Sequence, residues 1–126
     1  MRAVHLELCL AAVVSLSTCG CHAGRVTRGY QISVGDPNRG RELIEGYGCG
    51  SCHTIPGVHN ANGLVGPPLM FFSRRTMVAG ELPNTPDNLV RWIRHPRSVE
   101  HGTAMPDLGL SADQANDIAA YLYTLR

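Results

Sequence analysis

The most constraining feature of this sequence is the segment Cys49-Gly50-Ser51-Cys52-His53. Its two thiols stand three positions apart, and a histidine follows the second one directly. Two cysteines at this spacing suit a thioredoxin-like redox pair, one half of a zinc site or a local disulfide. The zinc interpretation needs two or three more cysteine or histidine ligands, and His59 is the only candidate close to the motif in sequence. The redox interpretation needs a βαβ pattern, which the chain lacks.

The adjacent histidine shifts the balance among these alternatives, because Cys-x-x-Cys-His is the attachment signature of c-type haem. Two thiols about one helical turn apart can each add to one vinyl group of the porphyrin. The histidine is then carried under the iron and coordinates it axially. The motif therefore predicts one haem c, covalently attached through Cys49 and Cys52, with His53 as an iron ligand.

The second axial ligand decides what such an iron can do. Met105 is the favoured candidate, because its thioether is a soft, neutral ligand that raises the reduction potential. An iron with two protein ligands has no position for a substrate, which suits electron transfer. The alternatives are that Met105 is a core residue, that the position is open, or that the ligand is another residue, namely Met70, Met77, His95 or His101.

Composition limits the chain to one small globular domain. Its 126 residues leave no room for a large catalytic fold, and 44% apolar with 17% charged residues excludes disorder throughout. The 11 basic residues are all arginines and face 10 acidic ones. This balance excludes a dedicated nucleic-acid binder.

Residues 1–21 have the order of a secretory signal: a basic start, a short apolar run and then small residues. The run is too short to span a bilayer. Cys19 or Cys21 behind it also permits a lipoprotein signal, with the cysteine as lipid anchor. We therefore expect an exported protein, periplasmic or on the outer face of the cytoplasmic membrane, with residues 22–36 as a flexible tether.

Three helices are predicted in the remaining domain, residues 37–126. They cover about 37–47, about 86–95, and the apolar stripe from Ala115 to the end of the chain. Their start signals are an N-cap followed by proline in the first two and a capping box in the third: Asp36-Pro37, Thr85-Pro86, and Ser111 with Gln114. Pro96 is expected to stop the second helix. The Gly- and Pro-rich loops between the helices need something to pack against.

Five motifs follow one another between Gly40 and Arg126: Cys49-x-x-Cys52-His53, Gly66-Pro67-Pro68-Leu69, Leu89-x-x-Trp92-Ile93-x-x-Pro96, Gly102-Thr103-Ala104-Met105-Pro106 and Ala120-Tyr121-Leu122. In this order they resemble the class I c-type cytochromes. The resemblance implies an all-α, cytochrome c-like fold, in which three main helices and long loops wrap around one covalently attached haem.

The resemblance also implies roles for residues around the haem. The carbonyl of Pro67 would accept a hydrogen bond from His53 and fix its orientation. Leu69 would pack on the haem, and Thr103 would reach a propionate. Trp92, which replaces the more familiar tyrosine, would lie beside the haem near the sulfur ligand.

A helix crossing is implied as well, with Gly40 of the first helix against Tyr121 of the last. Without the resemblance, Gly40 is simply a turn residue and Tyr121 an ordinary core residue.

Five arginines in the middle of the chain have three possible roles. They can form solvated surface, neutralise haem propionates, or make a docking patch for an acidic redox partner whose association weakens with salt. These residues are Arg74, Arg75, Arg91, Arg94 and Arg97. No lysine ring of the mitochondrial kind is present, so a partner cannot be inferred from those proteins.

The sequence thus predicts a monohaem cytochrome c that carries one electron in an extracytoplasmic respiratory chain and is not an enzyme. Its loop at residues 102–106 and its end at residues 119–123 are similar to haem domains associated with bacterial respiratory oxidases, so a terminal oxidase is the favoured redox partner. One alternative is the haem subunit of a periplasmic dehydrogenase complex. Another is a haem-based gas or redox sensor with a labile sixth ligand.

Overall fold

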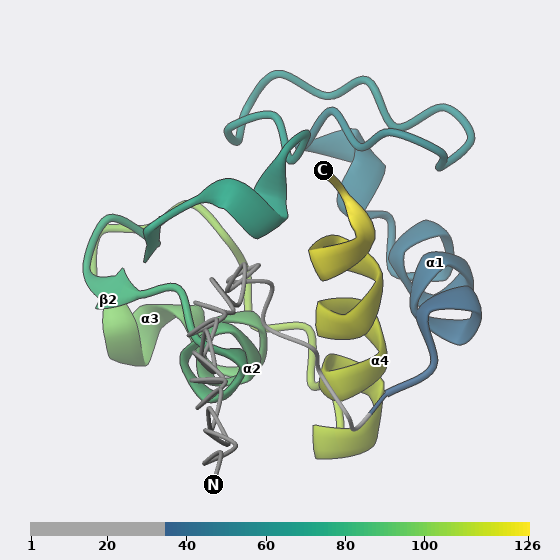
Figure 1. The fold of residues 1–126 in the computed structure, drawn as a ribbon. Helices are drawn as coiled ribbons and strands as arrows, with labels where there is room; N and C mark the ends of the chain where they lie inside the picture. Colours follow the sequence, from purple (N-terminus) through teal and green to yellow (C-terminus); the bar gives the residue numbers. More distant parts are fainter. Residues whose placement is uncertain (1–34) are drawn as a thin grey trace, which may run out of the picture.

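The computed structural model describes residues 35–126 (Figure 1). The predicted signal with Cys19 and Cys21, and the predicted tether up to residue 34, lie outside the described residues. The described chain contains four α-helices: α1 (Pro37–Gly46), α2 (Pro86–Arg94), α3 (Pro96–Val99) and α4 (Ala112–Thr124). It also contains the 3-10 turns η1 (Cys49–Ser51) and η2 (Phe72–Arg74), and the strands β1 (Met77–Val78) and β2 (Leu82–Pro83). Within residues 35–126, no helix has the length and apolar character needed to cross a membrane.

The three predicted helices are confirmed, with ends that differ by one or two residues. The Asp36 side chain accepts hydrogen bonds from the first-turn amides of α1, and the Thr85 side chain does the same for α2. Ser111 and Gln114 form both bonds of the capping box, at 3.2 and 2.9 Å. These local bonds satisfy amides that a helix start would otherwise leave without partners.

Helix α3 and the hairpin of strands β1 and β2 were not predicted. Pro96 ends α2, as expected, but it also begins α3, because a proline ring fits the first helical position. The strands β1 and β2 pair antiparallel, with Met77 opposite Pro83 and Val78 opposite Leu82. Their turn places Ala79 and Gly80 at φ of +57° and +77°. Alanine in that conformation is uncommon, so the sequence lacks the usual hairpin signal.

Helix α4 is the centre of the fold, and α1 and α2 contact it from different sides (Figure 1). At Gly40 the backbones of α1 and α4 come so close that a Cβ would lie 2.0 Å from the carbonyl oxygen of Asp117. The expected crossing of α1 and α4 at Gly40 is therefore present, and the backbone that Gly40 meets is that of Asp117 and Ile118, one turn before Tyr121. The Tyr121 hydroxyl donates a 2.6 Å hydrogen bond to the carbonyl of Pro56.

A buried carboxylate joins the start of the domain to this crossing. The side chain of Asp117 is 2% exposed. It accepts a 2.8 Å hydrogen bond from the backbone N–H of Asp36 and a second from Nε of Arg39. The bond from Arg39, the largest cause, lowers the pKa of this carboxyl below its ordinary value of 3.8.

We expect Asp117→Asn to destabilise the protein by about 1–3 kcal/mol at pH 7, because a charge-assisted buried bond is lost. A carboxyl with a lowered folded-state pKa stabilises the fold above its unfolded-state pKa, and that contribution is lost as the pH falls through the folded-state value. The difference between variant and wild type should therefore shrink below about pH 4. Denaturant unfolding at pH 7, 5 and 3 measures it.

The exposed Asp113 on the same helix supplies the control for this test. Asp113→Asn should change stability by less than about 0.5 kcal/mol at every pH, as is usual for surface substitutions. An Asp117→Asn penalty that stays constant down to pH 3 would contradict the role given to the ionised carboxylate.

Candidate functional site

One large cavity, of about 550 Å³, opens beside α4. Its walls come from α1, η1, the loop before η2, the β1 strand, α2, the loop around residues 103–110, and α4. Most of the lining side chains are apolar, and among the deepest are Ile44, Leu89, Ile118 and Leu122, all at most 4% exposed. A volume of this size lies in the range of pockets for small molecules and cofactors.

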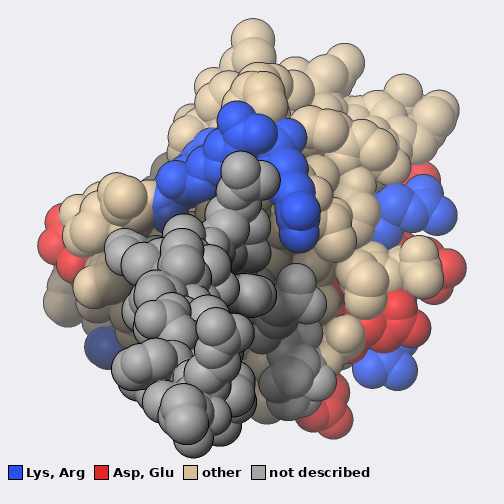
Figure 2. All heavy atoms as spheres, viewed as in Figure 1, with Lys and Arg blue, Asp and Glu red and all other residues tan. Residues whose placement is uncertain are grey.

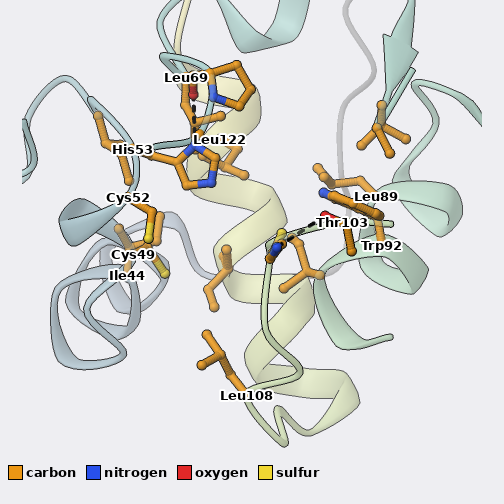
Figure 3. Close-up of a pocket in the computed structure, with 18 of the residues that line it drawn as sticks. Ile44, Cys49, Cys52, His53, Leu69, Leu89, Trp92, Thr103, Leu108 and Leu122 are labelled. Atoms are coloured by element: carbon orange, nitrogen blue, oxygen red, sulfur yellow. Dashed lines mark hydrogen bonds between the residues drawn. The ribbon is translucent and has the colours of Figure 1, made fainter. Parts of the chain in front are cut away.

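The sequence motif forms one wall of this cavity. Gly48, at φ of +70°, turns the chain into η1, and the N–H of His53 then donates to the carbonyl of Cys49 at 3.0 Å. Cys49 and Cys52 are both free thiols and both line the cavity. Burial raises the pKa of the Cys49 thiol. Figure 3 shows Cys49, Cys52 and His53 together along the same side of the cavity.

The imidazole of His53 is held in a fixed orientation. Its Nδ1 lies 2.7 Å from the carbonyl oxygen of Pro67, which is the bond drawn at His53 in Figure 3. A carbonyl can only accept, so Nδ1 is the donor in this bond, and in the neutral imidazole with this tautomer Nε2 has the free lone pair. Gly66 packs on the ring, since a Cβ there would lie 2.3 Å from its Cε1. The hydrogen bond expected from the resemblance is thus present in the fold.

The other predicted residues also line the cavity. Met105 is half-buried and lines the cavity, and its backbone N–H donates a 3.1 Å bond to Oγ1 of Thr103. Trp92 and Leu89 lie next to Thr103 in Figure 3. Within residues 35–126, the indole N–H of Trp92 donates no hydrogen bond. Leu69 lines the cavity from the loop whose Pro67 carbonyl is bonded to His53.

Of the residues considered as alternative iron ligands, only some line the cavity. Met77 also lines the cavity and is 43% exposed, whereas Met70 does not line it. His59, His95 and His101 do not line it either, and His95 faces Asp107 at 3.5 Å. In the described residues, no group of three or more His, Cys, Asp or Glu side chains is arranged to hold a metal ion. Residues 35–126 therefore contain no set of zinc ligands at this motif.

The five arginines do not act as one group. Figure 2 shows basic side chains gathered over the region of η2, where Arg74 stacks on Phe71 at 5.3 Å. Arg94 donates to the carbonyl of Leu110 at 3.2 Å. Arg75 alone of the five lines the cavity, and it also donates to the carbonyl of Pro68.

Comparison with known proteins places this geometry in a family. A model of the family described as cytochrome c matches residues 37–126, which is nearly all of the described chain. The chain belongs to the cytochrome c family. Its domain therefore has the cytochrome c fold, and the family's chemistry is electron transfer by haem.

Two relatives of this cytochrome are cytochrome c oxidase subunit 2 proteins. The one from Alkalihalophilus pseudofirmus is 36% identical over 90 residues, which cover 71% of this chain and 25% of the relative. The one from Bacillus subtilis is 32% identical over 92 residues, which cover 70% of this chain and 26% of the relative. The chain thus spans about a quarter of the length of the relatives it matches.

The residues present fit the haem that the family implies. The cavity is apolar and large, two free thiols and an imidazole with an available nitrogen line one wall, and a thioether lines another. Imidazole and thioether are the donor pair that holds iron in electron-transfer cytochromes. The cytochrome c assignment from sequence is therefore confirmed, and the family to which the chain belongs carries out electron transfer by haem.

Sequence reasoning missed Asn84, which is buried beside this site at 5% exposure. It lies outside every motif, between β2 and the N-cap of α2, and no periodicity or spacing marks it. A lone asparagine near a turn is usually a surface residue.

Proposed function

We propose that this cytochrome carries one electron at a time with a single haem c. Cys49 and Cys52 would hold the haem through thioether bonds, and His53 and Met105 would ligate its iron. The observation that carries this proposal is that all four side chains line one apolar cavity. When bound, the haem supplies a reversible one-electron change at iron.

The protein groups around the cavity have defined tasks in this proposal. Pro67 holds the proton of His53 at Nδ1, which keeps Nε2 available as a ligand and raises its basicity. Thr103 fixes the backbone of Met105 through its hydroxyl oxygen. The buried apolar walls limit the access of water to the site, and burial is one of the factors that set a haem's reduction potential. If His53 and Met105 both ligate the iron, no position would remain for a substrate, and the chain would act as a carrier and not as an enzyme.

We further propose that the protein works outside the cytoplasm, in a respiratory chain, with a terminal oxidase as electron acceptor. The order of residues in 1–21 supports export. The names of the relatives support an oxidase over a dehydrogenase complex, since both are cytochrome c oxidase subunits.

Optical spectra of the exported protein test this function. We expect sharp, reversible changes between oxidised and reduced forms, and no spectral change when carbon monoxide is added to the reduced protein at neutral pH. Ready binding of carbon monoxide would favour a gas sensor with an open or labile position. A colourless protein from a host that matures c-type cytochromes would overturn the proposal.

A further inference from the structure

We propose that Asn84 and Tyr123 are positioning residues for the imidazole of His53. They act through Arg75 and the Pro67-Pro68 segment, which accepts the hydrogen bond from His53. The inference rests on the proposed function, because it assumes that His53 is an iron ligand.

Asn84 is the centre of a buried hydrogen-bond network. Its side-chain nitrogen donates to the carbonyls of Phe72 and Arg75, at 3.2 and 3.1 Å. Its side-chain oxygen accepts a 2.8 Å bond from the hydroxyl of Tyr123 in α4. Its backbone N–H donates to the carbonyl of Thr76 at 2.9 Å. The amide side chain of Asn84 therefore joins Phe72 and Arg75 to α4, in addition to the two bonds that Ser73 donates to the carbonyl of Leu125 at the end of α4. Only an amide has both the two donors and the acceptor that these contacts of Asn84 require.

The rings around this network fix the segment in the same place. The rings of Tyr123 and Phe72 meet edge to face, with centroids 5.9 Å apart. The guanidinium of Arg75 then stacks on Phe72 at 5.3 Å. The direction of the Arg75 side chain is thus set by Phe72, whose ring is in turn held by Tyr123 of α4.

Arg75 transmits this placement to the histidine. Its guanidinium donates to the carbonyl of Pro68. The preceding carbonyl, of Pro67, accepts the bond from His53. A shift of the Pro67-Pro68 segment would lengthen or bend the His53 bond, which weakens steeply with poor geometry.

The same loop is attached from its other side by bonds that do not involve Asn84. The N–H of Gly66 donates to Cys52, and the N–H of Leu69 donates to Thr54, both at 2.8 Å. These bonds tie the loop to the chain that carries His53. The bond from Arg75 adds a link between this loop and the network of Asn84, whose bond to Tyr123 of α4 joins residues 39 positions apart in sequence.

Tyr123→Phe tests the proposal, because it removes the hydroxyl and keeps the ring on Phe72. The matched control is Tyr121→Phe, which removes a hydroxyl bond from the same helix, to Pro56, outside the network. Both tyrosines are similarly buried, at 8% and 9% exposure. The readout is the exchange rate of the Nδ1 proton of His53 with solvent, measured by NMR in the haem-loaded protein.

We expect the exchange rate in Tyr123→Phe to be at least ten times the wild-type rate. It should also be at least three times the rate in Tyr121→Phe. General loss of stability accelerates exchange in both variants, so a Tyr123→Phe effect less than threefold beyond the control overturns the proposal. If Tyr123→Phe does not fold, Arg75→Lys with Arg74→Lys as control takes its place, with the same thresholds. Lysine keeps the charge but lacks the planar fork of arginine.

The experiment also separates this inference from the proposed function. If wild-type protein shows no iron-shifted Nδ1 proton for His53, the ligand assignment fails, and the positioning role falls with it. If that proton is present but responds equally to Tyr123→Phe and Tyr121→Phe, His53 remains the ligand and only the positioning role is overturned.

Discussion

Cys49→Ala/Cys52→Ala protein, made without haem, is expected to lose its cooperative unfolding transition. The haem would bury at least about 400 Å² of apolar surface, which at ~25 cal/mol/Å² contributes about 10 kcal/mol before ordering costs. The whole stability of a typical domain is ~5–15 kcal/mol. Without the haem, the polypeptide therefore has little or no net stability left.

The cavity leads to the same expectation by a second estimate. An empty space of about 550 Å³ would cost about 13 kcal/mol at ~24 cal/mol per Å³, as an upper limit before the walls collapse. Thermal melts followed by circular dichroism measure the result. Haem-free protein with both thiols intact is the control, and it should behave like the double variant, because the haem and not the sulfurs stabilises the fold. A sharp melt in either haem-free protein would refute this account.

Met105→Ala is expected to abolish the absorption band that arises from sulfur-to-iron charge transfer. The reduction potential should fall by a sizeable fraction of the ~0.8 V over which axial ligands set haem potentials. The reduced variant should also bind carbon monoxide, because one axial position is then open. Optical titration and redox potentiometry of the purified variant measure these three effects.

Two other methionines provide controls for this prediction. Met77→Ala removes the other thioether that lines the cavity, and Met70→Ala removes one outside it. Both variants should keep the sulfur-to-iron band and refuse carbon monoxide. If Met77→Ala loses the band while Met105→Ala keeps it, the ligand assignment is wrong, although the cavity and its haem stay as proposed.

Much of the local structure was predictable from short stretches of sequence. The N-caps at Asp36 and Thr85 and the capping box at Ser111 each depend on residues within one turn of the helix, so the signal and the structure occupy the same few positions. The attachment motif is local for the same reason, since its thiols and its imidazole are fixed by spacing along one turn.

Contacts between distant segments were harder to predict. Gly40 was expected against Tyr121 of the last helix, but the expectation did not include which backbone it meets, and the structure places it on Asp117 and Ile118, one turn before Tyr121. A glycine marks where two helices can approach closely, but the neighbour it meets depends on the rotation of both helices. The β1–β2 hairpin was missed because Ala79 adopts the positive φ that the turn requires.

By itself, the sequence determined the cytochrome c family and the position of the main helices, and it predicted the residues that would hold the haem, because each of these follows from chemistry within a short stretch of the chain. The tertiary structure decided which distant groups meet. It brought Met105 and the Cys-x-x-Cys-His motif to one cavity, and of the five arginines it placed only Arg75 at that cavity. It also placed Asn84 between α4 and the segment of Arg75, which contacts the loop beside His53. Such pairings are set by how whole helices pack, and no local pattern records them.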